Sequence, residues 1–566
     1  MNGERNDALM NLRIHHMIAA TLVFLAVCPT WAGAVIYVDD DAPLGGNGAS
    51  WDTAYRYLQD ALVGAEVLVT EDSTGAVQGS REVRMVACVE IGQDGDPCCV
   101  EIRVAQGGYK PDEGANKTPG DRRASFELGS GLALKGGYAG LGMPNPNARD
   151  ITLYETILSG DLAGDDVDVN DPCDLENDLS RAENSYHVVY IENSDDTTLL
   201  ESVIVTGGSA WTIGGPGRGA SWKQYSGGGL LCLSSEGPVI AKCTFLANFA
   251  EMGGGVYNSS NAKIIECTFT MNAASAIGGE GGGMLSGGKP VIEKCEFIRN
   301  LASGGGGMAA NNTSEAIIIN SIFVENCASA GGAAWFISGS EQFRNCSFIR
   351  NSALGGGALR NGNNRLILLN CLFSQNFAKE RGGAIDNNAN KSLVIEDCTF
   401  ADNSSPNGNA ISRGGNLSIN SSVFWDGGQE IHDVSPVAVV YSNVQGGWLG
   451  AGNIDLNPLF VEPDNGDYHL KSQAGRWDPN NKTWIQDDVT SPCIDAGDPN
   501  SPIMYESFPN GGVINMGAYG GAVEASKSYF GGPVCETIVA GDINGDGRVD
   551  FEDLVILMSH WTEGEY

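Results

Sequence analysis

A six-residue motif recurs along this chain at nearly constant spacing. It reads Cys or Ser, any residue, Phe, any two residues, Asn, and it first occurs at residues 243–248. A degenerate last copy starts at Ser422. The phenylalanines of the motif lie 24 to 28 residues apart, at Phe245, Phe269, Phe297, Phe323, Phe348, Phe373, Phe400 and Phe424. Such regular repetition indicates a solenoid in which each repeat forms one coil.

A second marker, Gly-Gly followed by a small or apolar residue, lies between the copies, as in GGGVY at Gly253 and GGAI at Gly382. Each repeat also holds a short β-type run, such as residues 263–265, and no stretch of helical periodicity interrupts the repeats. Gly makes up 78 of 566 residues, about twice its ordinary share, which suits many tight turns. We therefore predict an all-β fold, a parallel β-helix with three short strands in each coil.

Stacked coils place like residues over like, about 4.8 Å apart. The Cys and Phe of the motif lie two residues apart on a strand and face the same side, so the phenylalanines should form one buried column. The Asn of the motif should form a ladder of side-chain amides from coil to coil, in a turn where Asn tolerates a left-handed backbone.

Two further columns, the residue before the motif and the residue two after Phe, are predicted to point outward. Where charged residues become neighbours in them, their signs mostly alternate, as in Lys242, Glu266 and Lys294. Alternation avoids repulsion between like charges on adjacent strands. The exception is Asp402 below Asp426, at the degenerate last copy.

The rest of the chain divides around these repeats. Residues 1–34 read as a signal peptide, because the apolar run 17–27 is short and small residues follow it at 32–34. We expect a cap and first coils over 35–208, regular repeats over 209–430, terminal coils over 431–524 and a linker over 525–540. A short amphipathic helix near residues 51–62 should cover the open end of the core. No later stretch could cross a membrane as a helix. The expected location is secreted or at the cell surface.

The net charge of −37 argues against a nucleic-acid partner, because phosphate binding needs clustered Lys and Arg. Acidity of this kind keeps an exported protein soluble.

The chain contains 15 cysteines, and six of them belong to the motif. These six form two groups of three, so neither group can pair off within itself, and we predict that they are buried thiols acting as small apolar residues. Better disulfide candidates are Cys88, Cys98 and Cys99. The spacing of Cys and His gives no zinc pattern.

The alternation of GGA-type and FxxN motifs resembles the repeats of polymorphic outer-membrane proteins. The segments YVDDDAP, SPCIDAGDP and INMGAYGG resemble bacterial right-handed β-helix repeat proteins of the pectate-lyase-like superfamily. The likeness covers roughly residues 35–521. It implies a right-handed parallel β-helix with an N-terminal cap.

The segment GDINGDGRVDFEDLVILMSHW, residues 541–561, matches a calcium-binding loop. Oxygen ligands at alternate positions can converge on one Ca²⁺, and Gly547 allows the sharp turn. The expected ligands are Asp542, Asn544, Asp546, the carbonyl of Arg548, Asp550 and Asp553. The apolar run that follows predicts the start of a helix, so we expect residues 541–566 to form an EF-hand-like unit.

This unit resembles one type I dockerin repeat. Dockerins normally carry two such repeats, and only one is present here. The preferred interpretation is a structural calcium loop; the alternative is docking to a cohesin-like partner.

Catalysis in pectate-lyase-like enzymes needs a basic residue beside calcium-binding carboxylates, or paired Asp and Glu side chains. We interpret the acidic cluster Asp161, Asp165, Asp166, Asp168 and Asp171 as a solvated loop. Residues 379–381, Lys-Glu-Arg, and Asp386 flank a GGAI turn and could meet on one face. No hydrolase signature stands out.

Two functions from different classes remain. The first is a non-catalytic secreted or cell-surface protein that presents a binding or structural surface to polysaccharide or cell-surface components. The second is a carbohydrate-active polysaccharide lyase or glycoside hydrolase. The even repeat and the missing catalytic set favour the first.

Overall fold

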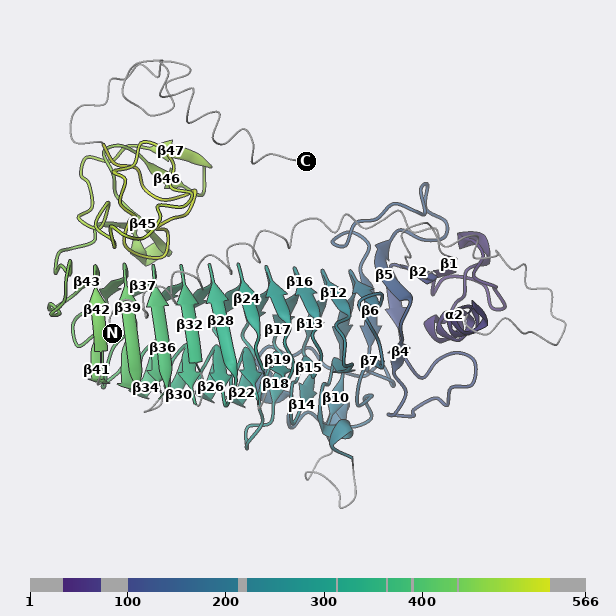
Figure 1. Cartoon of the computed structure of the whole chain (residues 1–566). Coiled ribbons are helices and arrows are strands. Elements are labelled where there is room, and N and C mark those ends of the chain that lie inside the picture. Colours follow the sequence, from purple (N-terminus) through teal and green to yellow (C-terminus); the bar gives the residue numbers. More distant parts are fainter. Residues whose placement is uncertain are drawn as a thin grey trace, which may run out of the picture.

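The computed structural model describes residues 34–72, 100–211, 221–311, 314–362, 365–387, 391–434 and 437–529. These residues form one long solenoid with a small lobe against its side, near the C-terminal end of the stack (Figure 1). The predicted signal peptide up to residue 33, Cys88, Cys98 and Cys99, and the predicted calcium loop lie outside the described residues.

The described strands of the solenoid form four parallel sheets, here called A to D. Sheet A contains β1 (Val35–Val38), β2 (Val100–Ala105), β5 (Leu132–Tyr138), β8 (Leu199–Glu201), β12 (Val239–Ala241), β16 (Lys263–Ile265), β20 (Val291–Glu293), β24 (Ile317–Ile319), β28 (Ser340–Arg344), β32 (Arg365–Leu369), β36 (Ser392–Glu396), β39 (Asn416–Asn420) and β42 (Val437–Val440).

Sheet B contains β3 (Gly107–Tyr109), β6 (Thr156–Ser159), β9 (Ile204–Thr206), β13 (Thr244–Leu246), β17 (Thr268–Thr270), β21 (Glu296–Ile298), β25 (Ile322–Val324), β29 (Ser347–Ile349), β33 (Leu372–Ser374), β37 (Thr399–Ala401), β40 (Val423–Trp425) and β43 (Asn443–Val444). Sheet C contains β4 (Phe126–Leu128), β7 (Val189–Glu192), β11 (Leu230–Leu233), β15 (Val256–Asn258), β19 (Met284–Ser286), β23 (Met308–Ala310), β27 (Ala334–Phe336), β31 (Leu359–Asn361), β35 (Ile385–Asn387), β38 (Ile411–Gly414) and β41 (Ile431–Val434).

Sheet D, the narrowest, contains β10 (Ser209–Ala210), β14 (Phe249–Ala250), β18 (Ala273–Ala274), β22 (Leu301–Gly304), β26 (Cys327–Ala330), β30 (Ser352–Gly355) and β34 (Phe377–Arg381). One coil therefore runs through sheets A, B, D and C in turn. The expectation of three strands per coil is wrong by one, because the residues after the ladder Asn pair with the next coil before the Gly-Gly turn.

The predicted phenylalanine column is confirmed. All eight rings are fully buried, and successive ring centroids lie 4.5 to 5.1 Å apart. The six motif cysteines beside them are buried free thiols, as predicted. Their sulfurs lie near backbone carbonyls, as Cys243 Sγ does at 3.3 Å from the carbonyl oxygen of Ala241.

The predicted asparagine ladder is also confirmed. The Nδ2 of Asn326 donates to Oδ1 of Asn351 at 3.0 Å and to the carbonyl of Phe297 at 2.8 Å, and the other ladder amides repeat this pattern. A buried side-chain amide that is satisfied in this way stabilises the stack, whereas an unsatisfied one would cost free energy.

The expected left-handed backbone falls elsewhere, which corrects the sequence interpretation. The residue before each ladder Asn has a positive φ, for example 55° at Glu325 and 52° at Arg350, and so does the residue before each motif, such as Lys242 at 53°. These are the two outward columns. Their alternating charges pair where expected, since Arg350 Nε lies 3.0 Å from Glu325 Oε1.

Asp426 does not belong to the outward column with Asp402, which is a second correction. The last repeat is one residue shorter after Phe424, so Asp426 occupies the ladder position, where its Oδ1 accepts from the backbone N and Nδ2 of Asn403 at 2.7 and 2.9 Å. The backbone N of Asp426 donates to Glu430 Oε1 at 3.1 Å, and both side chains are buried. The ladder therefore ends on two neighbouring carboxyl groups.

This carboxyl pair predicts a pH-dependent stability. Burial, followed by the nearby Glu430 carboxyl, raises the pKa of Asp426 well above its ordinary value, and burial raises the pKa of Glu430. A folded-state pKa above the unfolded value contributes stability below about pH 4 that is lost as the pH rises through the folded-state pKa. In the Asp426→Asn variant, the melting temperature should fall less than in the wild type as the pH rises from acid to mildly alkaline values.

The measurement is thermal unfolding across that pH range, with Asp488→Asn, an exposed carboxylate of the lobe, as the control. Equal slopes for the wild type and for Asp426→Asn would contradict the assignment.

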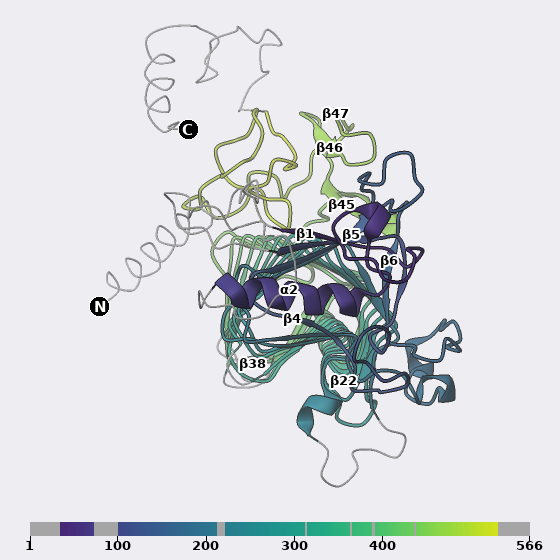
Figure 2. The same cartoon turned by 90° about the vertical axis from the view of Figure 1, so that its right-hand side faces the viewer.

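The N-terminal end of the core is covered as expected. The 3-10 helix η1 (Trp51–Thr53) precedes α2 (Leu58–Asp72), which extends further than predicted and lies across the end of the solenoid (Figure 2). Its residues Leu58, Ala61, Leu62 and Ala65 are buried against the core. Within the described part of the chain, no helix is long and apolar enough to cross a membrane.

Of the terminal coils expected over 431–524, only the first part belongs to the parallel stack, through β41, β42 and β43. The parallel stack ends at β43, and residues 460–529 form the lobe, with antiparallel pairs β44 (Phe460–Glu462) with β45 (Asp467–Leu470), and β46 (Arg476–Asp478) with β47 (Thr483–Ile485). Tyr468 of the lobe is buried and its hydroxyl donates to Asp402 at 3.2 Å. Ala525 and Ser528 are buried, so the lobe includes the start of the expected linker over 525–540.

The remaining 3-10 helices are η2 (Pro172–Asp174), η3 (Leu179–Arg181), η4 (Trp222–Tyr225) and η5 (Pro463–Asn465).

Candidate functional site

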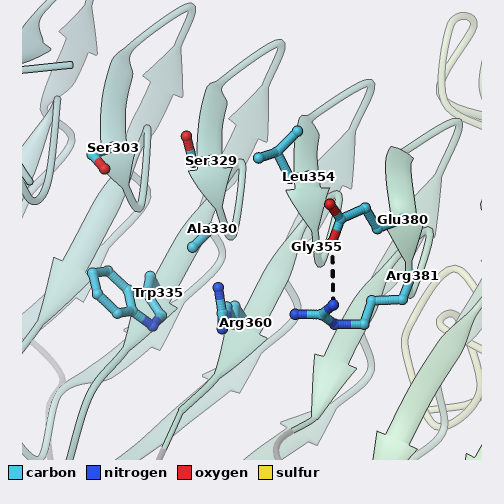
Figure 3. A pocket seen from close by; sticks show the side chains of 9 residues that line it. All are labelled: Ser303, Ser329, Ala330, Trp335, Leu354, Gly355, Arg360, Glu380 and Arg381. Carbon is cyan, nitrogen blue, oxygen red and sulfur yellow. Dashed lines mark hydrogen bonds and ion pairs between the residues drawn. The ribbon is translucent and has the colours of Figure 1, made fainter. Parts of the chain in front are cut away.

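A pocket of about 300 Å³ opens on the outer surface where sheets C and D meet. We call it the Trp335 pocket. Sheet C contributes Trp335 and Arg360 to one wall, and sheet D contributes Ser303, Ser329, Leu354 and Glu380 to the other (Figure 3). Its volume lies at the lower end of the range for small-molecule sites, so it suits a group of about the size of one sugar ring.

The floor of the pocket is open because the part of one register column of sheet D that lies beneath it consists of the small residues Gly304, Ala330 and Gly355. Gly304 pairs with Ala330, and Ala330 pairs with Gly355. A Cβ added at Gly304 would lie 1.9 Å from Cε3 of Trp335, so the indole can occupy its position only above a glycine. The backbone of the neighbouring coil therefore sets the position of the ring.

A β-bulge closes one end of the pocket. Between β30 and β34 the register shifts, so that Ala353 pairs with Ala378 but Gly355 pairs with Arg381. The extra residue in β34 brings Arg381 into the column of small residues. A β-bulge commonly changes the direction in which a side chain points.

Arg381 and Arg360 meet at one buried carboxyl group. Arg381 Nε lies 3.0 Å from Asp386 Oδ2, and Arg360 Nε lies 3.7 Å from the same oxygen. Asp386 has only 2% of its side chain exposed, whereas Arg360 and Arg381 keep 34% and 26% exposed. The prediction that residues 379–381 and Asp386 meet on one face is thus confirmed for Arg381, whereas Lys379 is not among the residues that line the pocket.

The exposed N–H groups of the two arginines can donate to an anionic ligand, while the carboxyl groups of Asp386 and Glu380 offset the charge of the guanidinium groups. Burial raises the pKa of Asp386, and the two guanidinium groups oppose that shift. The carboxylate of Glu380 accepts from Nη1 of Arg381 at 3.2 Å and is more than half exposed. Two guanidinium groups, each partly exposed and held by one buried acid, can bind a carboxylate or sulfate through several N–H groups.

The same geometry is poorly suited to bond cleavage. Hydrolysis of a glycosidic bond needs one carboxylic acid and one carboxylate on opposite sides of the bond. Among the described residues at the pocket, Asp386 and Glu380 both bind Arg381. A guanidinium group that is paired with carboxylates stays protonated, so it is a poor base for a lyase.

The acidic cluster of the 161–171 loop is only partly solvated, which corrects the interpretation from sequence. Asp161 accepts from the backbone N of Gly164 and of Asp166, at 2.6 and 3.2 Å. Asp166 lies 3.5 Å from the buried Arg181, and burial raises the pKa of Asp166 to about 6. These contacts hold the loop in place against the solenoid.

The predicted calcium ligands, Asp542, Asn544, Asp546, Arg548, Asp550 and Asp553, lie outside the described residues, so this site stays a prediction. Within the described residues, the side-chain oxygens of Asp39, Asp40 and Asp41, and those of Asp161, Asp165 and Glu183, lie close enough to share a metal ion.

Sequence reasoning missed Trp335, Arg360 and Gly304. The signal was present in the residues that follow each Gly-Gly marker. Aligning GGAAW, GGGALR and GGAID places Trp335, Arg360 and Asp386 in one column, as the register of sheet C has them. The position of Gly304 beneath the indole needs the geometry of two sheets and could not be read from spacing.

Comparison with known proteins agrees with this architecture. The family model for the right-handed β-helix region matches residues 156–301 and 283–443, which together span about half of the chain. The chain belongs to this family of right-handed β-helix proteins. The resemblance to right-handed β-helix repeats is therefore confirmed for the fold.

Three further likenesses are more limited. A family described as disaggregatase related matches residues 434–497. The metabotropic glutamate receptor-like protein R of Dictyostelium discoideum is 29% identical over 206 residues, which are 35% of this chain and 11% of that protein. The chain therefore spans about a tenth of the relative that it matches. The crystal structure of pectate lyase Pel9A is 13% identical, with a TM-score of 0.40 over 86% of this chain and 97% of that chain.

Proposed function

We propose that this protein is a secreted or cell-surface β-helix protein that binds an acidic polysaccharide in the Trp335 pocket without cleaving it. One observation carries the proposal: the Trp335 indole lies over Gly304, beside two arginines that share the buried Asp386. A flat indole can pack on the apolar face of a sugar ring, and the guanidinium groups can hold its acidic substituent.

The net negative charge of the whole chain should restrict anion binding to this pocket. At a net charge of −37 the protein repels anions in general. Repulsion from distant carboxylates is screened over about 10 Å at ordinary ionic strength. Inside the pocket, Arg360 and Arg381 offer N–H donors to an acidic group, and Asp386 and Glu380 offset their charge. Acidic glycans should therefore bind here and weakly elsewhere.

Export and calcium binding belong to the same proposal. Residues 1–34 have the pattern of a signal peptide, and residues 541–566 have the ligand spacing of one calcium repeat. A cohesin-like protein is the partner that the dockerin resemblance suggests for this repeat.

The alternative is a polysaccharide lyase or glycoside hydrolase. The buried Asp386 favours it, because a carboxyl group with a raised pKa suits a general acid. The close contact with Arg381 argues against it, since the guanidinium stabilises the ionised form.

The test uses the mature chain and a panel of polygalacturonate, alginate, a sulfated glycan and a neutral glucan. We expect retention on at least one acidic glycan and not on the neutral one. New reducing or unsaturated ends should form more slowly than about 1 s⁻¹ per chain. Faster cleavage would establish the alternative, with Asp386 and Arg381 as the first residues to substitute. Failure to retain any acidic glycan would overturn the proposal.

A further inference from the structure

The lobe exposes a group of large apolar side chains close to residue 529, where its described part ends. Their exposed fractions range from 47% at Tyr529 to 70% at Tyr505. Single exposed apolar residues are ordinary on a protein surface, whereas a contiguous group marks an interaction site. We call this group the Tyr505 patch, and it consists of Met504, Tyr505, Phe508, Val523 and Tyr529.

Hydrogen bonds hold the two segments of the patch side by side. The backbone N of Tyr505 donates to the carbonyl of Gly521 at 3.0 Å, and Ser507 Oγ donates to the carbonyl of Val523 at 3.1 Å. The backbone N of Ser528 donates to the carbonyl of Pro509 at 3.1 Å. Residues 504–509 therefore lie alongside residues 521–528, and the exposed side chains of both segments belong to one area of the surface.

The patch has a fixed shape because polar groups beneath it are paired. Glu506 is buried, and its Oε1 accepts from the backbone N of Asn515 and of Gly521 at 2.8 and 2.9 Å. The Tyr529 hydroxyl donates to the carbonyl of Gln473 at 3.0 Å. A surface that is already ordered loses little conformational entropy when a partner binds.

The sequence after the lobe contains a segment that needs such a surface. At 3.6 residues per turn, the helix predicted after the calcium loop has six apolar side chains on one side, and the expected ligand Asp553 falls outside that side. A helix over residues 551–561 is about 16 Å long, and helices this short are marginal in water unless their apolar face packs against another surface. The six side chains are Phe551, Leu554, Val555, Leu557, Met558 and Trp561.

The connection between the lobe and the calcium loop keeps this segment near the patch. Residues 530–540 separate Tyr529 from the predicted loop and can span at most about 40 Å. A tether of this length gives the helix a high effective concentration at the lobe. The patch consists mainly of Met, Tyr and Phe, which are enriched at the centres of protein interfaces. Its composition therefore suits an apolar helix.

We propose that the Tyr505 patch is the docking site of residues 551–561 of the same chain, and that calcium binding to the predicted loop promotes this docking. The inference rests on the calcium site of the proposed function. Asp553, at the twelfth loop position, belongs to the predicted helix, so an ion that binds Asp553 also holds the first turn of that helix. Docking and calcium binding therefore stabilise each other by the same coupling free energy.

The test is hydroxyl-radical footprinting of the full mature chain with and without Ca²⁺, since the oxidation of a side chain follows its exposure to solvent. In the wild type, saturating Ca²⁺ should lower the oxidation of Met504, Tyr505 and Phe508 at least about threefold, because the docked state then dominates the population. Phe377, half-exposed on β34, should be oxidised equally in both samples. Leu557→Asp, which keeps every expected ligand, should lose this protection and bind Ca²⁺ about tenfold more weakly.

Tyr505→Ala measures the same coupling from the side of the lobe. It should weaken Ca²⁺ binding about fivefold or more in a calorimetric titration. Phe377→Ala, which also removes an exposed aromatic ring, should leave the affinity unchanged. A thermal melt checks that the lobe of the Tyr505→Ala variant stays folded.

Calcium binding without protection of the patch would overturn the docking and leave the calcium site intact. Protection that persists in Leu557→Asp, or that appears together with the mass of a dimer in light scattering, would assign the patch to another occupant, such as a second copy of the chain, and would also overturn the docking. If the wild type binds no Ca²⁺, the calcium site of the proposed function falls, and this inference falls with it.

Discussion

Truncation of Phe323 to alanine should lower the free energy of unfolding by about 3 to 5 kcal/mol, because it opens a cavity in the middle of the ring column. Phe323 is fully buried, and its ring stacks on those of Phe297 and Phe348, with centroid distances of 4.6 and 5.1 Å. Phe343 contacts it edge-on at 6.0 Å. Close packing on several sides leaves little room for the neighbours to relax into the space.

Chemical denaturation of the two proteins measures this difference, and Phe377→Ala provides the control. Phe377 lies on β34 and is 50% exposed, so its truncation should cost less than about 1 kcal/mol. A similar small effect for Phe323→Ala would mean that the phenylalanine column does not stabilise the solenoid.

Calcium binding should be abolished by Asp542→Ala. Asp542 is the first ligand of the predicted loop, and four carboxylates within 12 residues repel one another unless a cation is bound. Because the sequence places this loop outside the β-helix repeats, the melting temperature of the solenoid should stay the same. The expected affinity is about 10⁻⁴ to 10⁻³ M, the range typical of extracellular modules.

Calorimetric titration of the intact mature chain with Ca²⁺ measures the affinity, and a thermal melt measures the stability of the solenoid. Glu552→Gln is the matched control, because it removes a carboxylate at a loop position that supplies no ligand. Heat that persists unchanged in Asp542→Ala would place the ion elsewhere, for example at Asp161, Asp165 and Glu183. If the wild type gives no heat, the assignment of the calcium loop is wrong, and the resemblance to a dockerin is wrong with it.

The interior of the solenoid could be predicted from sequence because stacking converts spacing into contact. A residue that recurs about once per coil must lie over its own copies, so the phenylalanine column, the free thiols and the asparagine ladder all followed from one motif. The cap helix followed from the need to cover an open end of the core.

The parts that break the repeat could not be predicted in this way. Asp426 took the ladder position because one residue is missing after Phe424, and Arg381 reached the pocket because β34 contains one extra residue. Such shifts change which side chains are neighbours without changing the motif. The lobe over 460–529 lies beyond the repeats, so the periodicity gave no information about it.

The backbone conformation of the residues with a positive φ could not be predicted from sequence either. Their columns were recognised by charge, but the backbone that they adopt depends on how sheets A, B and D turn into one another. Glu325 and Arg350 accept a positive φ because this conformation aims the following Asn into the ladder.

The central claim is that the Trp335 pocket binds an acidic glycan, and a titration with polygalacturonate tests it most directly. Trp335→Ala removes the ring, while Gly304→Ala keeps every polar group of the pocket and displaces only the indole. Both should weaken binding at least about tenfold relative to wild type, whereas Phe377→Ala, outside the pocket, should not. Unchanged affinity in both pocket variants would show that the glycan is bound elsewhere or not at all.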